Sequence, residues 1–236
     1  MLSLIGLGLN DEKDISVKGL ERVKTADYVY MENYTSKLQC SLQDLEKYYG
    51  KTVIPVEREF VEDGTVLLSQ AGYQNIVLLI VGDVFSATTH ISLVLMAKEK
   101  QIDTQIIHNA SILNAVGITG LELYKFGRTT SIPFHESDTP YECIKKNFPL
   151  HTLCLLDLVP SENKFMEASK AIEKLTKSGF SQETKVVVCA QLGSKNPTIL
   201  YTQAKNVKAL NTYPQCLIVP GELHFIEKEA LSLYNK

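Results

Sequence analysis

The stretch MLSLIGLGLNDEKDIS, residues 1–16, is an apolar run that ends in a glycine turn and continues at once into polar residues. This pattern is typical of a buried strand that leads into a loop of an α/β sheet. A dinucleotide loop requires G-x-G-x-x-G, but Asp11 occupies the position of the third glycine. The carboxylates of Asp11, Glu12 and Asp14 would also repel a pyrophosphate. The stretch therefore predicts either an ordinary strand-to-loop turn or a site for a cationic or zwitterionic ligand.

Short apolar segments alternate with amphipathic segments along the chain, which predicts an α/β fold. The glycine-containing stretch 117–128 divides these segments into two groups. We therefore expect two α/β domains, residues 1–116 and 117–236, with a crevice between them. The expected strands are 2–7, 28–31, 53–56, 76–81, 104–107, 151–158, 184–190 and 215–219. The expected helices are 15–24, 41–48, 91–100, 111–117, 164–177 and 225–234.

The composition argues against several classes of protein. The 236 residues are 44% hydrophobic and 22% charged, as in a globular protein with a substantial core. The net charge of −3 and the lack of a Lys/Arg run argue against nonspecific nucleic-acid binding. The longest later apolar run, 76–81, is too short to cross a membrane, and no basic segment of a signal peptide precedes the first run. Five scattered cysteines without a CxxC pair indicate reduced thiols, and we expect a cytoplasmic protein.

The stretch VGDVFSATTH, residues 81–90, follows the clearest buried strand. It places Asp83 at the carboxyl end of that strand, where open α/β sheets bind ligands. The structural alternative is that Asp83 caps a turn and that Thr88 or Thr89 caps the next helix. Both interpretations remain open from this pattern alone.

Two further stretches carry candidate residues. IHNASILNAVGITG, residues 107–120, has small residues that allow either a bound ligand or close helix packing. PGELH, residues 220–224, presents His224 either as a ligand contact or as a core or capping histidine. The patterns of a phosphate-binding loop, a serine nucleophile elbow and a zinc site do not occur, and the five histidines lack metal-ligand spacing.

Taken together, these stretches resemble a known family. The motifs LIGLGL–DEKDI, GLE, Y–E–YTS, VGD–F–ATTH, IHNASI–NAVG–TGL–LY–FG–T–SI–F and HTLCLLD occur in this order. They resemble the diphthine synthases, which are methyltransferases of diphthamide biosynthesis within the tetrapyrrole methylase-like enzymes. The resemblance is dense over residues 1–157 and thinner over 160–236.

The resemblance implies a fold of two α/β domains with S-adenosylmethionine in a cleft between them, usually in a homodimer. This cofactor carries a sulfonium and a zwitterionic amino acid but no phosphate, which agrees with the acidic residues after the glycine turn. No metal is implied. Carried over position by position, the cofactor-binding residues are Leu9, Asp83, Ser86, Ser111, Ile112, Leu156, His224 and a position in CAQLG, for which Ala190 and Leu192 are the candidates.

The implied reaction is the repeated methylation of a histidine of translation elongation factor 2 that already carries a 3-amino-3-carboxypropyl group. We expect the eukaryotic product, diphthine methyl ester; trimethylation of the nitrogen alone is the other possible product. Methyl transfer from a sulfonium mainly requires alignment of donor and acceptor, and a dry pocket lowers the pKa of an ammonium, so we name no general base. His90 and Asp83 are the candidates nearest the expected cleft.

The chain departs from the family pattern at several positions. Val84 and Ser86 stand where the family has proline and glycine, and Gln191 stands where an arginine is expected. The segment after Asp157 is also short, which affects how a protein substrate would dock. Two other hypotheses therefore stay open: a methyltransferase of the same fold that acts on a tetrapyrrole or ribosomal RNA, and a non-catalytic binding module.

Overall fold

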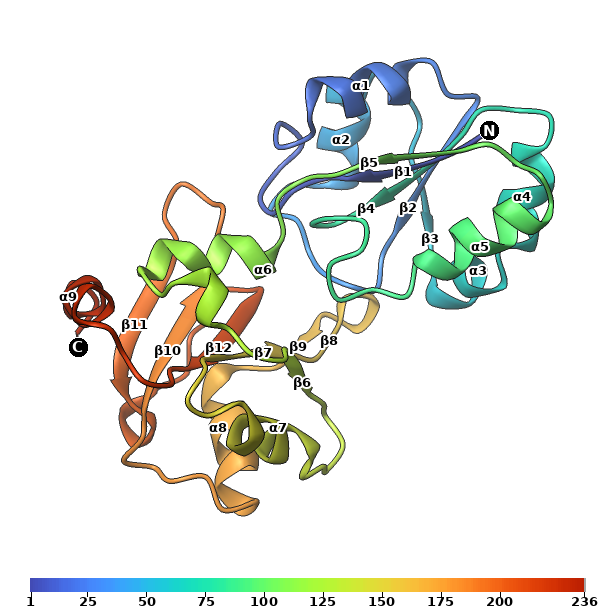
Figure 1. Cartoon of the computed structure of the whole chain (residues 1–236). Helices are drawn as coiled ribbons and strands as arrows, with labels where there is room; N and C mark the ends of the chain where they lie inside the picture. Colours follow the sequence, from blue (N-terminus) through green and yellow to red (C-terminus); the bar gives the residue numbers. More distant parts are fainter. Residues whose placement is uncertain (236) are drawn as a thin grey trace. The chain divides into compact units, whose positions relative to one another are not determined.

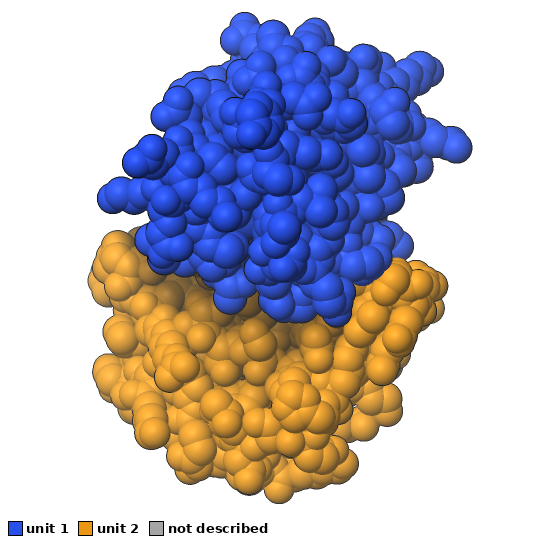
Figure 2. Space-filling view, turned by 90° about the vertical axis from the view of Figure 1, so that its right-hand side faces the viewer, with its two compact units in different colours: residues 1–112 blue, residues 113–236 orange. Residues whose placement is uncertain are grey.

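The computed structural model describes residues 1–235, and the chain divides into two compact units, Met1–Ile112 and Leu113–Lys236. Figure 2 colours the first unit blue and the second orange. Each unit has its own five-stranded sheet and its own buried core. The division follows Ile112, whereas the sequence places the boundary after residue 116.

The first unit contains a parallel sheet with the strand order β3-β2-β4-β1-β5 (Figure 1). Every neighbouring pair is parallel, so all five strands bring their carboxyl ends to the same edge. The expected strands of this unit are confirmed, with ends that shift by no more than one residue. They are β1 (Leu2–Gly6), β2 (Tyr28–Glu32), β3 (Ile54–Val56), β4 (Ile76–Ile80) and β5 (Thr104–Ile107).

Helices cover both faces of this sheet, because alternate strand residues point to opposite sides. Leu2 and Leu4 belong to a core cluster that includes residues of α3, α4 and α5, whereas Ile5 belongs to a cluster with residues of α1 and α2. Figure 1 shows these two groups of helices on opposite sides of the sheet. The helices are α1 (Val17–Lys24), α2 (Leu42–Tyr49), α3 (Arg58–Asp63), α4 (Thr65–Ala71) and α5 (Ile91–Glu99).

Local residues explain where α2 begins and ends, but not where α5 begins. Ser41 forms a capping box at the start of α2, and Gly50 ends the helix in the left-handed conformation. The expected cap of α5 by Thr88 or Thr89 is wrong, because α5 has no side-chain cap. Thr88 instead donates its hydroxyl to the carbonyl of Val84, 2.7 Å away, within its own loop.

The second unit contains a mixed sheet with the order β11-β10-β12-β7-β6. β6 and β7 run parallel, whereas β12 is antiparallel to both of its neighbours, β7 and β10. The helices α7 (Thr139–Asn147) and α8 (Ala168–Lys177) contribute to the main core of this unit. The last element of the unit is the helix α9 (Phe225–Ser232). The strands are β6 (Thr130–Ile132), β7 (Thr152–Leu156), β10 (Lys185–Ala190), β11 (Thr198–Gln203) and β12 (Gln215–Val219), and α6 (Ile112–Ala115) lies at the division between the units.

The structure contains elements that the pattern of apolar residues does not predict: α3, α4, α7, β6 and β11. Residues 164–167, expected to begin a helix, instead contribute β9 (Lys164–Phe165), which pairs with β8 (Leu158–Val159). The ring of Phe165 stacks on the ring of Tyr213, with centroids 5.1 Å apart. This tertiary contact and the hairpin pairing explain why α8 begins only at Ala168.

Three general features of the described chain bear on function. The five cysteines are free thiols, and all except Cys40 are buried. Among residues 1–235, no helix has both the length and the apolar character needed to span a bilayer. In the same residues, no group of three or more His, Cys, Asp or Glu side chains could hold a metal ion.

Candidate active site

The glycine turn of residues 6–8 lies at the carboxyl edge of the first sheet, where β1 ends between β4 and β5. A Cβ atom on Gly6 would lie 2.6 Å from the carbonyl oxygen of Gly82 and 2.9 Å from the Cβ atom of Asn109. These distances leave no room for a side chain. Gly6 therefore allows the loops that follow β4 and β5 to approach each other across the end of β1.

Gly8 and Gly82 join the same loops through the backbone. The N–H of Gly8 donates to the carbonyl of Gly82 over 3.2 Å, and the N–H of Gly82 donates to the carbonyl of Gly8 over 2.7 Å. Both residues have the positive φ that favours glycine, +78° and +84°. A Cβ atom on Gly82 would meet nothing closer than the side chain of Ser111, 3.8 Å away. A Cβ atom at position 82 would thus be in ordinary van der Waals contact with Ser111, and it is the positive φ that favours glycine there.

The acidic residues after the turn occupy the position where a phosphate would bind. Oδ2 of Asp14 accepts the N–H groups of Leu9 and Asn10 over 3.2 and 2.8 Å. Asp11 accepts the N–H of Lys13 over 2.9 Å. A dinucleotide loop offers its free N–H groups to the pyrophosphate, but here carboxylates already use them. The turn is therefore unsuited to a dinucleotide, and its negative charge favours a cationic ligand.

Asn109 connects three loops at this edge. Its Nδ2 donates to the carbonyls of Gly6 and Asp14, each over 2.9 Å, and its Oδ1 accepts the N–H of Ala110 over 2.7 Å. Its own backbone N–H donates to Asp83 over 3.0 Å. These contacts satisfy both ends of the amide, so the Asn109 side chain fixes the loops after β1 and β5 in one arrangement.

Asp83 links the loop after β4 with the loop after β5. Its Oδ1 accepts the N–H of Phe85 over 3.1 Å, and its Oδ2 accepts the N–H of Asn109 and lies 2.8 Å from Nδ1 of His108. Burial alone would raise the pKa of this carboxyl, but these hydrogen bonds and His108 lower it below its usual value. Asp83 is therefore an ionised carboxylate near neutral pH. Its expected role in a turn is confirmed, and its contact with a ligand stays a prediction.

Five of the nine predicted cofactor residues gather at this edge of the first unit. Leu9 directly follows the glycine turn, and Ser86 lies in the loop after β4, with its Oγ 3.4 Å from Oδ1 of Asp83. Ser111 is buried after β5, and Ile112 begins α6. They are adjacent because their strands β4, β1 and β5 are neighbours in the parallel sheet.

His90, one of the two candidates for a general base, is buried away from solvent. Its ring is 3% exposed, and Nδ1 lies 3.2 Å from the carbonyl oxygen of Val84. Nε2 lies 3.0 Å from Oε2 of the buried Glu32 and 3.4 Å from the hydroxyl of Tyr34. Both ring nitrogens thus face protein groups. His90 contacts the buried side of the loop 83–90 through the carbonyl of Val84. This buried position does not suit direct proton exchange with a substrate.

In the second unit, Leu156 and Ala190 end the strands β7 and β10 at the same edge of the sheet. The register of β12 pairs Ala190 with Gln215, and it pairs Leu155, the residue before Leu156, with Cys216. Leu192 lies two residues beyond Ala190 and is buried. The structure therefore brings these three predicted residues to one edge of the second sheet.

His224 lies at the opposite edge of the same sheet. Because β12 is antiparallel to β7, its last residue, Val219, pairs with Thr152 at the start of β7. His224 follows β12 and immediately precedes α9. The structure therefore does not bring His224 together with Leu156 and Ala190.

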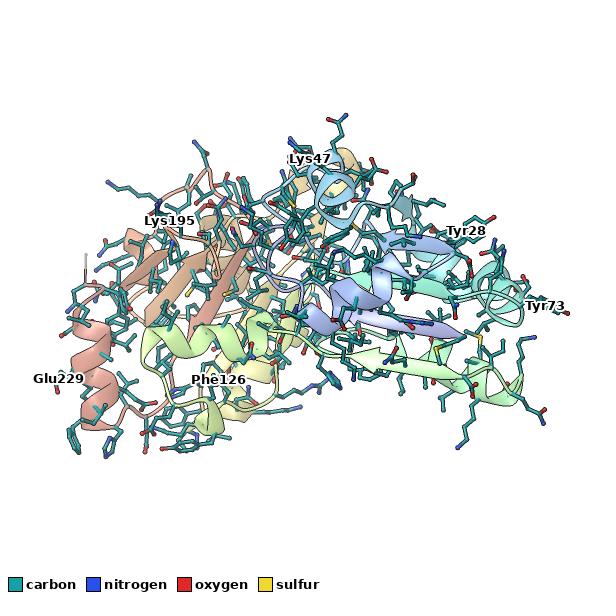
Figure 3. All side chains as sticks on the ribbon, turned by 90° about the horizontal axis from the view of Figure 1, so that it is seen from above. Tyr28, Lys47, Tyr73, Phe126, Lys195 and Glu229 are labelled. Carbon is teal, nitrogen blue, oxygen red and sulfur yellow. The ribbon has the colours of Figure 1, made fainter. Side chains whose placement is uncertain are left out.

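The start of α9 fixes the backbone of His224. Its N–H donates to Oε2 of Glu227 over 2.8 Å, as expected of a residue that precedes a helix. Figure 3 labels Glu229 on α9 and Lys195 in the loop after Leu192, and the two lie at separate places on the second unit. His224 therefore occupies the capping position before α9, but it is exposed, so the core alternative is wrong; its contact with a cofactor stays a prediction.

The departures from the family pattern have local structural roles. Gln191 adopts a positive φ of +53°, and its side-chain amide donates to the carbonyl of Tyr213 over 3.1 Å. Asp157 accepts the N–H groups of Phe134 and Leu158 over 2.9 and 3.0 Å, so the short segment after it folds back as the β8–β9 hairpin. These contacts stabilise the second unit without a longer insertion.

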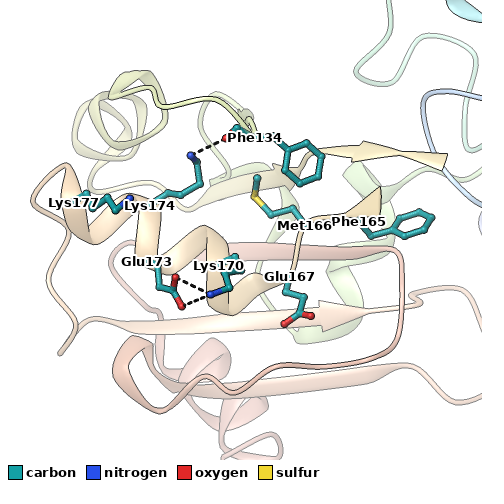
Figure 4. A pocket seen from close by; sticks show the side chains of 8 residues that line it. All are labelled: Phe134, Phe165, Met166, Glu167, Lys170, Glu173, Lys174 and Lys177. Carbon is teal, nitrogen blue, oxygen red and sulfur yellow. Dashed lines mark hydrogen bonds and ion pairs between the residues drawn. The ribbon is translucent and has the colours of Figure 1, made fainter. Parts of the chain in front are cut away.

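A separate hollow of about 260 Å³ lies beside α8 in the second unit (Figure 4). Its lysines are paired: Lys170 lies 3.1 Å from Glu173, and Lys174 and Lys177 lie 3.4 and 3.3 Å from Glu136. Because each of these ammonium groups has a carboxylate partner, the hollow offers little excess positive charge to an anion. It is lined by Phe134, Phe165, Met166, Glu167, Lys170, Glu173, Lys174 and Lys177.

Comparison with known proteins identifies the family. Residues 1–208 match the family of tetrapyrrole (corrin/porphyrin) methylases. A protein of Arabidopsis thaliana named "Probable diphthine methyl ester synthase" is 41% identical, over 100% of this chain and 98% of its own length. The diphthine synthase of Methanocaldococcus jannaschii is 42% identical, over 98% of this chain and 97% of its own. The chain belongs to the diphthine synthase family.

The solved structures support the same assignment for the fold. A crystal structure of a diphthine synthase matches with a TM-score of 0.93 and 38% identity, over 99% of this chain and 95% of the other. The predicted α/β fold and the predicted methyltransferase family are confirmed. The alignment with the Arabidopsis relative spans 272 positions against 236 residues here, so at least 36 of its positions have no counterpart in this chain.

Proposed function

We propose that this diphthine synthase family methyltransferase uses S-adenosylmethionine to methylate the 3-amino-3-carboxypropyl group on a histidine of translation elongation factor 2. The reaction takes place in the cytoplasm. The choice of S-adenosylmethionine as donor rests on the glycine turn. There the carboxylate of Asp14 accepts hydrogen bonds from the N–H groups of Leu9 and Asn10. The choice of acceptor rests on the similarity to diphthine synthases over nearly the whole chain.

The residues at the edge of the first sheet fit the proposed methyl donor. S-adenosylmethionine supplies a methyl group on a positively charged sulfur. The ionised Asp83 and the acidic residues after the turn give this edge the negative charge that a sulfonium and an ammonium require. We assign Leu9, Asp83, Ser86, Ser111 and Ile112 to this binding site.

The remaining assignments rest on the resemblance. We propose that Leu156, Ala190 and Leu192 also contact the methyl donor, since they share one edge of the second sheet. His224 and the homodimer stay predictions. We favour the methyl ester as the product, because the Arabidopsis relative is named for that activity.

The experiment uses elongation factor 2 from a strain that accumulates the unmethylated intermediate. The purified protein is incubated with it and with S-adenosylmethionine, and mass spectrometry follows the peptide that carries the modified histidine. We expect mass gains in methyl steps, with four methyl groups for the ester and three for methylation of the nitrogen alone. Unchanged mass, with S-adenosylmethionine bound to the protein, would point instead to another acceptor or to a binding module.

A further inference from the structure

His108 and Asp83 form an imidazole–carboxylate pair at the carboxyl edge of the first sheet. Nδ1 of His108 lies 2.8 Å from Oδ2 of Asp83, and the His108 side chain is 66% exposed. The pair joins the loop after β5 to the loop after β4, among the residues assigned to the methyl donor. His108 itself is not among the residues that the resemblance assigns.

The hydrogen bond determines which ring nitrogen of His108 carries the proton. Asp83 is ionised and accepts, so Nδ1 of His108 must donate. In the neutral imidazole, Nε2 then carries the lone pair. Asp83 cannot turn away from this contact, because the N–H groups of Phe85 and Asn109 hold its two oxygens. The arrangement resembles the orientation of a catalytic histidine by a buried carboxylate.

The surroundings of His108 leave Nε2 accessible. The ionisable group in contact with its ring is Asp83, and the ring of Phe85 lies edge-on with centroids 6.0 Å apart. His90, the other histidine near this loop, has both ring nitrogens against protein groups. Of these two histidines, His108 is the one that could exchange a proton with a substrate.

The proposed reaction requires such an exchange. The acceptor amine carries a proton near neutral pH, and an ammonium has no lone pair with which to attack a methyl group. Each transfer to the nitrogen also leaves a cationic amine that must lose a proton before the next transfer. A dry pocket lowers the pKa of the ammonium, but the proton that it loses still needs an acceptor.

We propose that Nε2 of His108 is the proton acceptor for the substrate ammonium, an inference that rests on the proposed function. The N–H bond of the ammonium breaks, its electron pair stays on the amine nitrogen, and a new N–H bond forms on Nε2. The resulting imidazolium returns its proton to water, to which the exposed side chain has access. Asp83 stabilises the imidazolium and keeps Nδ1 protonated throughout.

The test uses the variant His108→Asn and the control His135→Asn, an exposed histidine of the second unit. The Nδ2 of asparagine can replace Nδ1 of histidine as the donor to Asp83, so the loop keeps its hydrogen bond while the base is lost. Rates of the first methylation of elongation factor 2 are measured from pH 6.5 to 9.5, together with the affinity for S-adenosylmethionine.

We expect His108→Asn to slow the first methylation about 100-fold at pH 7. The defect should shrink as the pH rises, because the free amine then forms in solution. Affinity for S-adenosylmethionine should change less than about threefold, and His135→Asn should match the unmodified protein. A His108→Asn profile parallel to that of the unmodified protein at every pH would overturn the proposal. Inactivity of the unmodified protein on elongation factor 2 would instead contradict the proposed function.

Discussion

Gly6 shows how a single missing side chain shapes the candidate site. The carbonyl of Gly82 and the Cβ of Asn109 both occupy the space that a Cβ atom on Gly6 would need. The sequence leaves two interpretations of the glycine turn open, an ordinary strand-to-loop turn and a site for a cationic or zwitterionic ligand. At Gly6, however, the groups that approach are the protein's own loops, and these loops carry Asp83 and His108.

The substitution Gly6→Ala tests this role. A methyl group there would overlap Gly82, so we expect a loss of about 1–3 kcal/mol in the free energy of unfolding, measured by urea denaturation. Affinity for S-adenosylmethionine should fall as well, because the loops after β4 and β5 must separate.

The matched control is Gly72→Ala. Gly72 has a helical φ of −64°, and a Cβ atom there would lie 3.4 Å from its nearest neighbour. We expect this variant to stay within about 0.5 kcal/mol of the unmodified protein. Equal stability of the two variants would show that Gly6 does not hold the loops together.

At the scale of the element, the buried carboxylate of Glu227 is one of the contacts that attach α9 to the rest of the second unit. Glu227 accepts hydrogen bonds from the N–H groups of Glu122 and His224 over 2.9 and 2.8 Å. It also pairs with Lys125, and its Oε1 lies 2.8 Å from Nε2 of His151. The side chain of Glu227 is fully buried, so these partners compensate for its loss of hydration.

The attachment of α9 should depend on pH. Burial alone would raise the pKa of Glu227, but Lys125, the two N–H groups and His151 lower it from 4.5 to about 2. Because the pKa is lower in the folded state, the stabilisation is present above pH 4.5 and is lost as the pH falls towards 2.

The variant Glu227→Gln should therefore lose about 3 kcal/mol at pH 7, because Lys125 and His151 lose their charged partner. Its difference from the unmodified protein should shrink between pH 5 and pH 3 in urea unfolding experiments. Glu229→Gln, an exposed position on the same helix, is the control and should leave the profile unchanged. A difference that is constant with pH would contradict the role of the carboxylate charge.

At the scale of the whole molecule, the chain contains two sheets of different construction. The first is wholly parallel and covered by helices on both faces, so its functional loops collect at the carboxyl edge. The second is mixed: the loops after β7 and β10 leave from one edge, whereas the loops after β11 and β12 leave from the opposite edge. This difference explains why five predicted residues meet in the first unit while His224 lies away from Leu156 and Ala190.

Ligand binding should stabilise the folded chain in a way that distinguishes the proposed cofactor from a dinucleotide. At 100 times its dissociation constant, S-adenosylmethionine should add about 2.7 kcal/mol, which corresponds to an increase of roughly 5–10 °C in the unfolding temperature. NAD should give no increase, because Asp14 already uses the N–H groups that a pyrophosphate needs. Differential scanning calorimetry with each compound measures both effects, and a shift with NAD would contradict the assignment of the turn.

The patterns of apolar residues were sufficient for the elements with strong local signals. Ile76–Ile80 is an uninterrupted buried run, and α2 carries both its capping box and its terminal glycine, so each was predicted within one or two residues. The short helices α3 and α4 and the hairpin β8–β9 were missed, since their residues are ordered by packing and strand pairing rather than by a long period.

The features of the candidate site likewise fall into those that the sequence predicts and those that only the tertiary structure shows. The amino-acid sequence alone was sufficient for the family, the glycine turn and the position of Asp83 after a buried strand, because these depend on residues close together in the chain. Only the tertiary structure showed that His90 is buried beside Glu32 and that His108 is held by Asp83. Those pairs are separated by 58 and 25 positions in the chain, and they meet because strand order and loop packing bring distant segments together. A single sequence records which side chains are available, whereas the order of strands in the sheet decides which of them touch.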